Sequence, residues 1–221
     1  MSHTVHPYSH RLGIIRDWKS RWFASHKKFR EFLKADVLLR EFLEKKLKGM
    51  YVSSIEMERG EKSLRLIIKT SRPGVIIGRS GEGSVKLRND VVKFLTKHKL
   101  MLGQEVKIDI EEIRSPEANA TIVAHMIAEG LEKRMPFRRV MKQTVEKVMA
   151  NRDVLGIKIY LGGRLGGADM ARSEVMKKGR IPLQTLRADI DYATYRATIP
   201  QGDLGIKVWI YKGEIFDKDK N

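Results

Sequence analysis

Residues 72–81 read Arg-Pro-Gly-Val-Ile-Ile-Gly-Arg-Ser-Gly. The short apolar run in this stretch, residues 75–77, ends at a glycine-bounded loop, residues 78–81. Beyond the loop, apolar side chains recur at helical spacing to about residue 97. The pattern predicts two helices joined by this loop.

The sequence on either side of this stretch is typical of strands. Residues 52–59 and 63–70 flank a turn at 60–62, and in the second of them apolar and polar side chains alternate, which predicts a β-hairpin. Residues 105–111 alternate in the same way, so we expect another strand with one buried face.

A helix is expected ahead of the hairpin. Leucines repeat every four residues from Leu39 to Leu47, Asp36 is of a type favoured at a helix N-cap, and Gly49 suits the position after the helix end. We therefore expect a helix over about 37–48, which makes the order of elements αββααβ.

A second domain is expected from about residue 113. Ser115 and Pro116 are typical of a helix start, with Ser115 as the N-cap, and helical patterns run to about residue 134 and again over about 136–149. A further helical pattern follows Gly167, and strands are expected over 155–161, over 185–199 with a break, and over 205–211.

The predicted fold class is therefore α+β, with two domains. The expected parts are an N-terminal arm (1–24), a first domain with its leading helix (25–112), a second domain of two or three helices packed on an antiparallel sheet (113–216), and a short tail (217–221).

The charge balance points to a polyanionic partner. The chain has 221 residues, and its 44 Lys plus Arg against 27 Asp plus Glu leave a formal net charge of +17. Such a surplus is typical of nucleic-acid binding. Because 42% of the residues are hydrophobic, the chain can build cores, which excludes a disordered basic tail.

Several function classes are excluded by composition. There is no cysteine, so disulfides, thiolate zinc sites, iron–sulfur clusters and a cysteine nucleophile are impossible. No apolar run approaches the roughly 18 residues of a membrane span, and residues 1–15 lack a signal-peptide pattern. We expect a chain of the cytosol or an organelle interior, with no membrane partner, metal or cofactor.

The loop Gly78-Arg79-Ser80-Gly81 suits a nucleic-acid backbone. Glycines let phosphate approach the main chain, the N–H groups that begin the next helix point outward, and Arg79 adds a cation. The alternative interpretation is a tight turn between two helices. The position of the loop inside αββααβ favours RNA binding.

The helix expected after Pro136 has a basic face. Its apolar residues form one stripe, and Arg138, Arg139 and Lys142 fall on the opposite arc. With Lys133 and Arg134 just before the proline, these cations can contact successive phosphates. A solvated helix face is the alternative, and the scarcity of acidic residues here favours phosphate binding.

No residue pattern indicates catalysis. The glycine-rich stretch 162–167 has neither a Walker nor a dinucleotide-binding pattern, so it is either a structural turn or a phosphate contact. Asp189 and Asp191 share one face of an expected strand, and salt bridges with Arg187 and Arg196 are favoured over acid–base chemistry. We therefore expect no catalytic residue.

The residues identify a family resemblance. Arg72-Pro73-Gly74 with the loop that follows resembles the type II KH domain. Outside it, residues 5–23, Phe137-Arg138-Arg139, residues 162–168 and the segment from Gly179-Arg180-Ile181-Pro182 to Tyr192 resemble the bacterial-type small-subunit ribosomal protein three family over nearly the whole chain.

This resemblance implies a structural, RNA-binding constituent of the small ribosomal subunit, present in one copy in the head of the subunit. It places the chain beside the channel through which mRNA enters, with ribosomal proteins ten and fourteen as neighbours. The basic helix residues would then line this channel and assist mRNA unwinding. The rRNA contacts implied are Arg11, Arg164, Arg172, Lys177, Lys178 and Arg180.

The chain departs from the family pattern at three places. The loop has one cation, Arg79, where two are common, Gly83 loosens the first turn of the next helix, and Gln184 replaces a common histidine. Two rival hypotheses remain from other classes: a free KH regulator or RNA-processing enzyme, and a membrane-surface binder, which lacks the amphipathic basic helix with exposed aromatics that it would need.

Overall fold

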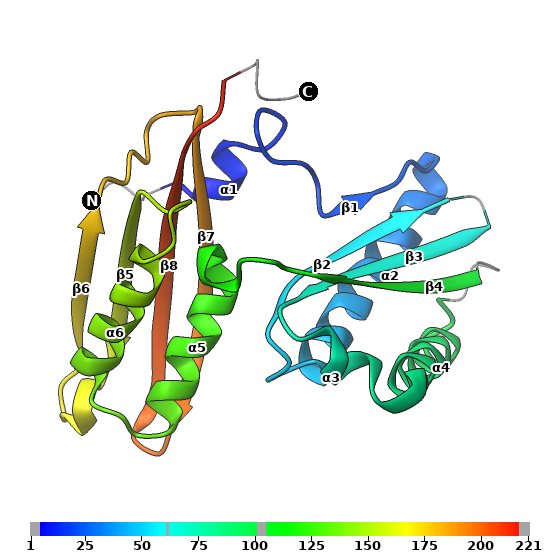
Figure 1. Ribbon diagram of the computed structural model, residues 1–221. Helices are drawn as coiled ribbons and strands as arrows, with labels where there is room; N and C mark the ends of the chain where they lie inside the picture. The colour runs from blue at the N-terminus through cyan, green and yellow to red at the C-terminus, as the bar shows by residue number, and fades with distance from the viewer. Residues whose placement is uncertain (1–4, 61, 101–104, 217–221) are drawn as a thin grey trace. The chain divides into compact units, whose positions relative to one another are not determined.

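The computed structural model describes residues 5–60, 62–100 and 105–216 (Figure 1). The chain divides into two compact units. Trp18–Arg114 form the middle unit, whereas Met1–Asp17 and Ser115–Asn221 together form the C-terminal unit. The expected tail, 217–221, lies outside the described residues.

The middle unit has the predicted αββααβ order. Its sheet runs β1-β2-β3-β4, with β2 and β3 antiparallel and β3 and β4 parallel. The hairpin strands begin and end where the sequence pattern placed them. The elements are β1 (Ser20–Arg21), α2 (His26–Lys46), β2 (Val52–Arg59), β3 (Ser63–Thr70), α3 (Pro73–Ile77), a 3-10 turn (Arg79–Gly81), α4 (Glu82–Lys97) and β4 (Glu105–Glu112).

Helices α2 and α4 cover one face of this sheet (Figure 1). Leu39 and Leu43 of α2 pack with Leu66 of β3 and Val91 of α4 in one cluster from which water is excluded. The apolar side chains that recur every four residues in α2 and every two residues in β3 face each other in this core.

The leading helix is longer than predicted, and Asp36 does not cap it. Helix α2 begins at His26, so Asp36 lies in its interior, where its carboxylate accepts hydrogen bonds from Trp22 Nε1 at 2.7 Å and from Arg59 at 2.6 Å. The side chains of Asp36 and Arg59 are 6% and 2% exposed. Asp36 is a buried ion-pair partner, which local sequence could not show because Arg59 belongs to another element.

The expected arm, 1–24, is divided between the two units. Helix α1 (Pro7–His10) packs against strand β7 (Ala188–Ile199) of the C-terminal unit. Beyond Asp17 the chain belongs to the middle unit, where β1 pairs with β2 and Trp22 packs against Phe29 and Phe32 at ring distances of 5.3 and 5.6 Å. The arm is therefore two anchored segments rather than one separate part.

The C-terminal unit confirms helices packed on an antiparallel sheet. Its sheet has the order β6-β5-β8-β7 with all neighbours antiparallel, and α5 and α6 lie on one face (Figure 1). The elements after α1 are α5 (Ala120–Glu132), α6 (Phe137–Met149), β5 (Gly156–Gly163), β6 (Arg172–Gly179), β7 (Ala188–Ile199) and β8 (Gly202–Glu214), with 3-10 turns at Pro116–Ala118 and Leu165–Gly167.

Two predictions in this unit were wrong. Ser115 does not cap a long helix: α5 begins at Ala120, and Asn119 Oδ1 accepts hydrogen bonds from the backbone N–H groups of Thr121 and Ile122. The segment after Gly167 contains a strand, β6, instead of the expected helix: Glu174 and Met176 turn toward the helices, while Val175 between them is exposed. Few residues of β6 are apolar, so the alternation of apolar and polar side chains is weak in its sequence.

We expect Asp36→Ala to destabilise the middle unit by about 3–5 kcal/mol, because it removes the carboxylate that balances the buried charge of Arg59. Asp109→Ala, which removes an exposed carboxylate of the same unit, should cost little. Hydrogen exchange of peptides covering β2 and β3 at increasing urea measures both. Equal effects of the two changes would contradict the structural role of Asp36.

Candidate nucleic-acid interface

The glycine loop between α3 and α4 has a backbone that restricts its sequence. Gly78 and Gly81 have φ of +71° and +81°, and Ser80 has φ of +52°. These left-handed conformations favour glycine. Arg79 and Ser80 are exposed, as are Val75 and Val85 beside the loop. The loop thus offers a cation, accessible main chain and apolar side chains on one surface.

Gly83 does not loosen the helix as expected. A Cβ atom there would lie 2.5 Å from the carbonyl oxygen of Ile76 and 2.8 Å from that of Ile77. Glycine at this position lets the first turn of α4 pack directly on the end of α3. The residue therefore fixes the geometry of the loop, which corrects the interpretation from helix propensity.

Helix α6 exposes the predicted basic residues. Val140, Met141, Val145 and Val148 are buried in the core, and Thr144 completes the buried stripe. The cations on the opposite arc are exposed: Arg138, Arg139 and Lys142.

The α6 cations differ in their partners. Arg138 forms an ion pair with Glu174 of β6 at 2.9 Å, which raises the pKa of the arginine and lowers that of the carboxyl. Arg139 and Lys142 make no ion pair within the described residues. Sequence reasoning missed Glu174 because it treated the segment of β6 as a helix.

The cations before α6 lie in the turn from α5. Lys133 pairs with Glu129 of α5 at 2.6 Å, while Arg134 is exposed and has φ of +60°. Arg134 is thus held in a left-handed turn that directs the chain into α6.

Arg11 is not available to RNA. Its side chain is fully buried, and its guanidinium donates hydrogen bonds to the carbonyl oxygens of Pro7 at 3.0 Å, Leu183 at 3.0 Å and Thr185 at 2.9 Å, and to that of Ala188. Burial lowers the pKa of Arg11 despite the nearby carboxylate of Asp189. The implied rRNA contact is therefore wrong: Arg11 ties the arm to the segment before β7.

The other residues expected at rRNA lie on the surface of the C-terminal unit. Arg164 donates to the carbonyl oxygens of Ala168 and Gln201 at 2.9 and 3.2 Å, so it holds the glycine-rich turn closed. The guanidinium of Arg172 lies over the ring of Phe137 at 5.7 Å. Exposed cations continue along and beyond edge strand β6: Lys177, Lys178 and Arg180.

Asp189 and Asp191 have structural partners that differ from those expected. Asp189 pairs with Arg16 of the arm at 2.6 Å, and Asp191 accepts from the backbone N–H of Ala120 at 2.9 Å. Arg187 and Arg196 pair instead with Glu214 and Asp203. A register shift between Asp189 and Ile190 changes which side chains become neighbours.

Two features are absent from the part of the chain that the structure describes: a cluster of metal-ligating side chains and a membrane-spanning helix. Among residues 5–60, 62–100 and 105–216, no three His, Asp or Glu side chains are grouped as a metal site would require. Within the same residues, no helix combines the length and the apolar character needed to cross a bilayer.

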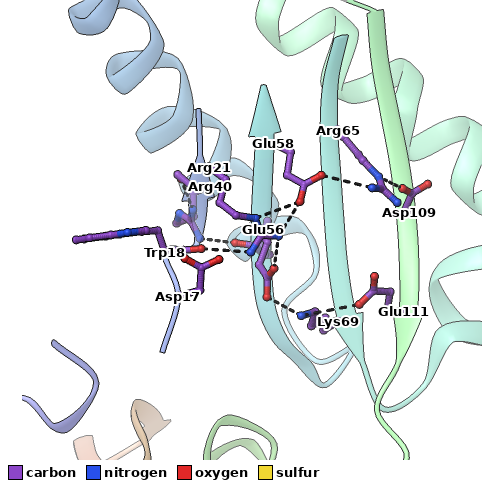
Figure 2. Close-up of polar contacts among 12 residues, drawn as sticks. Asp17, Trp18, Arg21, Arg40, Glu56, Glu58, Arg65, Lys69, Asp109 and Glu111 are labelled. Carbon is purple, nitrogen blue, oxygen red and sulfur yellow. Dashed lines mark hydrogen bonds and ion pairs between the residues drawn. The ribbon is translucent and has the colours of Figure 1, made fainter. Parts of the chain in front are cut away.

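The middle sheet has an open face, the one opposite to α2 and α4. Acidic and basic side chains on this face pair with one another (Figure 2). Arg21 binds Glu58 and Glu56 at 2.8 and 2.9 Å, which raises the pKa of the guanidinium. Burial acts to raise the pKa of Glu56, but hydrogen bonds from Lys69 and Arg21 outweigh it, so that the pKa is lowered. The network continues through Arg65 to Asp109 and through Lys69 to Glu111.

Comparison with known proteins gives matches over nearly the whole chain. Residues 38–118 match the KH domain family, and residues 127–210 match the family described as Ribosomal protein S3, C-terminal domain. The small ribosomal subunit protein uS3 of Xanthomonas campestris pv. campestris (strain 8004) is 49% identical over 217 residues, which cover 98% of this chain and 86% of the relative. That of Pseudomonas paraeruginosa (strain DSM 24068 / PA7) is 47% identical over 215 residues, 97% of this chain and 91% of the relative.

We expect Gly83→Ala to destabilise the middle unit by about 1–3 kcal/mol, because the added methyl group forces α4 away from α3. Gly74→Ala is the matched control: a Cβ there meets nothing within 4 Å, so stability should stay equal or rise by up to about 1 kcal/mol. Urea unfolding measures both, and an unchanged Gly83 variant would contradict the proposed close packing.

Arg11→Lys separates a structural role from an RNA contact. The change keeps the charge but removes the planar fork of donors, so we expect a loss of at least about 1.5 kcal/mol and faster hydrogen exchange over residues 182–190. Arg180→Lys, at an exposed position, should leave exchange unchanged. Wild-type exchange in the Arg11 variant would contradict the structural role.

Proposed function

This chain belongs to the small ribosomal subunit protein uS3 family, and on that premise we propose that it is a structural, RNA-binding constituent of the small ribosomal subunit and acts in translation. The relatives are named as ribosomal proteins, not as enzymes. The net charge of +17 agrees with an environment of RNA phosphates.

The observation that carries this proposal is the pair of surfaces with unneutralised cations. The loop 78–81 lets a phosphodiester backbone approach Arg79, and α6 directs Arg139 and Lys142 away from its core. Contacts of this kind position RNA without reading its bases. We propose that both surfaces bind small-subunit rRNA or mRNA rather than protein.

The finer assignment follows the family resemblance. We propose that the chain lies in the head of the subunit in one copy, with ribosomal proteins ten and fourteen as neighbours, on ribosomes of the cytoplasm and without a cofactor. The rRNA contacts are assigned to Arg79 with its loop and to the exposed cations of the C-terminal unit: Arg164, Arg172, Lys177, Lys178 and Arg180.

Helix α6 is proposed to line the channel through which mRNA enters. Arg138, Arg139 and Lys142 would hold the phosphates of an incoming strand, with Lys133 and Arg134 in the preceding turn. Cations on a rigid helix can favour separated strands by binding their backbones, because single strands let phosphates follow the spacing of the side chains. No proton transfer or bond cleavage is needed for this role.

The triple change Arg138→Ala, Arg139→Ala and Lys142→Ala tests the role of α6. In reconstituted small subunits, we expect slower unwinding of an mRNA hairpin. For single-stranded RNA, the slope of log K against log salt should become shallower by about 2, from roughly 0.7 for each lost contact. Folding should be unchanged, because none of the three side chains belongs to the buried stripe.

A charge-preserving variant supplies the control. Arg138→Lys with Arg139→Lys keeps the positive charges on α6, so the salt slope should remain close to that of the unchanged chain. If the alanine variant unwinds the hairpin at the wild-type rate in subunits that contain it, α6 does not act on mRNA.

A further inference from the structure

The sheet of the C-terminal unit has a second face, opposite to α5 and α6. Side chains on alternate positions of its strands point there, among them Lys158 and Tyr160 of β5, Lys207 and Trp209 of β8, and Lys177 of β6. At one end of this face the N-terminal segment packs, with His6 edge-on to Tyr192 at a ring distance of 4.7 Å.

The lysines of this face rest on aromatic rings instead of carboxylates. Lys158 Nζ lies 4.9 Å from the ring centre of Trp209, and Lys207 Nζ lies 5.5 Å from that of Tyr160. Lys177 stands opposite Lys158 on the edge strand. None of the three lysines forms an ion pair in the part of the chain that the structure describes, so their charge is available to an anion.

The ring of Tyr160 lies beside a surface without side chains. A Cβ atom on Gly162 would come within 3.1 Å of this ring, and Gly205 is the cross-strand partner of Gly162. Glycines inside strands often mark a place where another molecule approaches the backbone closely. Here the Tyr160 ring itself lies against Gly162, while Gly205 is exposed and a Cβ atom there would meet only the carbonyl oxygen of Gly162, at 3.8 Å, so the main chain beside the ring is open to another molecule.

The open face of the middle sheet provides a contrast within the same chain. Its charged side chains are four cations, Arg21, Arg65, Lys69 and Lys107, and five anions, Glu56, Glu58, Glu105, Asp109 and Glu111. The net charge there is 4 − 5 = −1, and most members pair with one another (Figure 2). Such a face does not attract phosphate, whereas the C-terminal sheet carries unpaired cations and aromatic rings.

We propose that the open face of the C-terminal sheet binds an unpaired segment of small-subunit rRNA, which rests on the proposed ribosomal function. A base stacks on Tyr160, and the adjoining phosphates bind Lys158, Lys177 and Lys207. Aromatic side chains flanked by cations bind single strands in this way on other sheets.

Charge and position select rRNA as the occupant. Three unpaired lysines fit a phosphate backbone better than a protein surface of mixed charge. The face lies opposite to α6, so mRNA bound along α6 is separated from it by the sheet itself. A stable segment of rRNA can stay on this face while mRNA moves.

Photo-cross-linking in assembled subunits tests the assignment. We would replace Tyr160, and in a second chain Lys177, by p-benzoylphenylalanine, with replacement of Lys107 on the middle sheet as the control. In isolated small subunits we expect rRNA products from the first two positions at yields about tenfold or more above the control.

The outcomes separate this inference from the proposed function. Products with a neighbouring protein, or yields equal to the Lys107 control, in subunits that contain the chain would overturn the rRNA assignment alone. A wild-type chain that fails to travel with small subunits would overturn the proposed function itself.

Binding by the free full-length chain gives a second readout. The ligand is a twelve-nucleotide single-stranded RNA. For the variant Lys158→Gln, Lys177→Gln, Lys207→Gln, the slope of log K against log salt should become shallower by about 2, from roughly 0.7 for each lost phosphate contact. Tyr160→Leu should weaken binding by about 5- to 160-fold, the equivalent of one lost stacked base.

A matched variant controls for net charge. Lys34→Gln, Lys45→Gln, Lys48→Gln removes the same charge from exposed positions of the middle unit. We expect a smaller change in slope for this variant. Equal slopes for the two triple variants would overturn the proposal.

Discussion

The need to place a surplus of seventeen positive charges governs the rest of this structure. Two small hydrophobic cores must form while the positive charges are kept apart, and each acidic residue can neutralise only a few of these charges. The protein concentrates ion pairs on the open face of the middle sheet and at the buried Asp36–Arg59 pair. Cations without a carboxylate partner among the described residues lie on the glycine loop, on α6 and on the second sheet, and we propose that these surfaces exchange their counterions for RNA phosphates.

The shape of the surfaces that we propose for RNA binding depends on tight backbone packing. Gly83 lets α4 touch α3 and so fixes the loop that carries Arg79. In the C-terminal unit, the buried guanidinium of Arg11 joins the arm to the segment that leads into β7. Gly83 lowers stability because glycine loses more conformational entropy on folding than other residues, and the burial of Arg11 requires desolvation of its charge. Both residues keep rigid the backbone that carries exposed cations.

The sequence alone predicted the features that depend on local periodicity. The hairpin, the loop between two helices and the basic arc of α6 follow from repeats of 2 and 3.6 residues within one element. It could not predict features made by distant partners. Asp36 resembled a cap because its partner Arg59 lies in strand β2, and Arg11 resembled an RNA contact because all but one of its acceptors lie more than 170 residues away. Strand β6 was mistaken for a helix because one face of it is almost wholly polar.

The central claim is that the open face of the C-terminal sheet, whose lysines form no ion pair within the described residues, meets RNA, and that the largely ion-paired open face of the middle sheet does not. The most direct measurement is lysine acetylation followed by mass spectrometry, on the free chain and on the chain in intact small subunits. The account predicts strong protection of Lys158, Lys177 and Lys207 in the subunit, with Lys69 and Lys107 of the middle sheet little changed. Strong protection of the middle-sheet lysines while the other three stay reactive would contradict it.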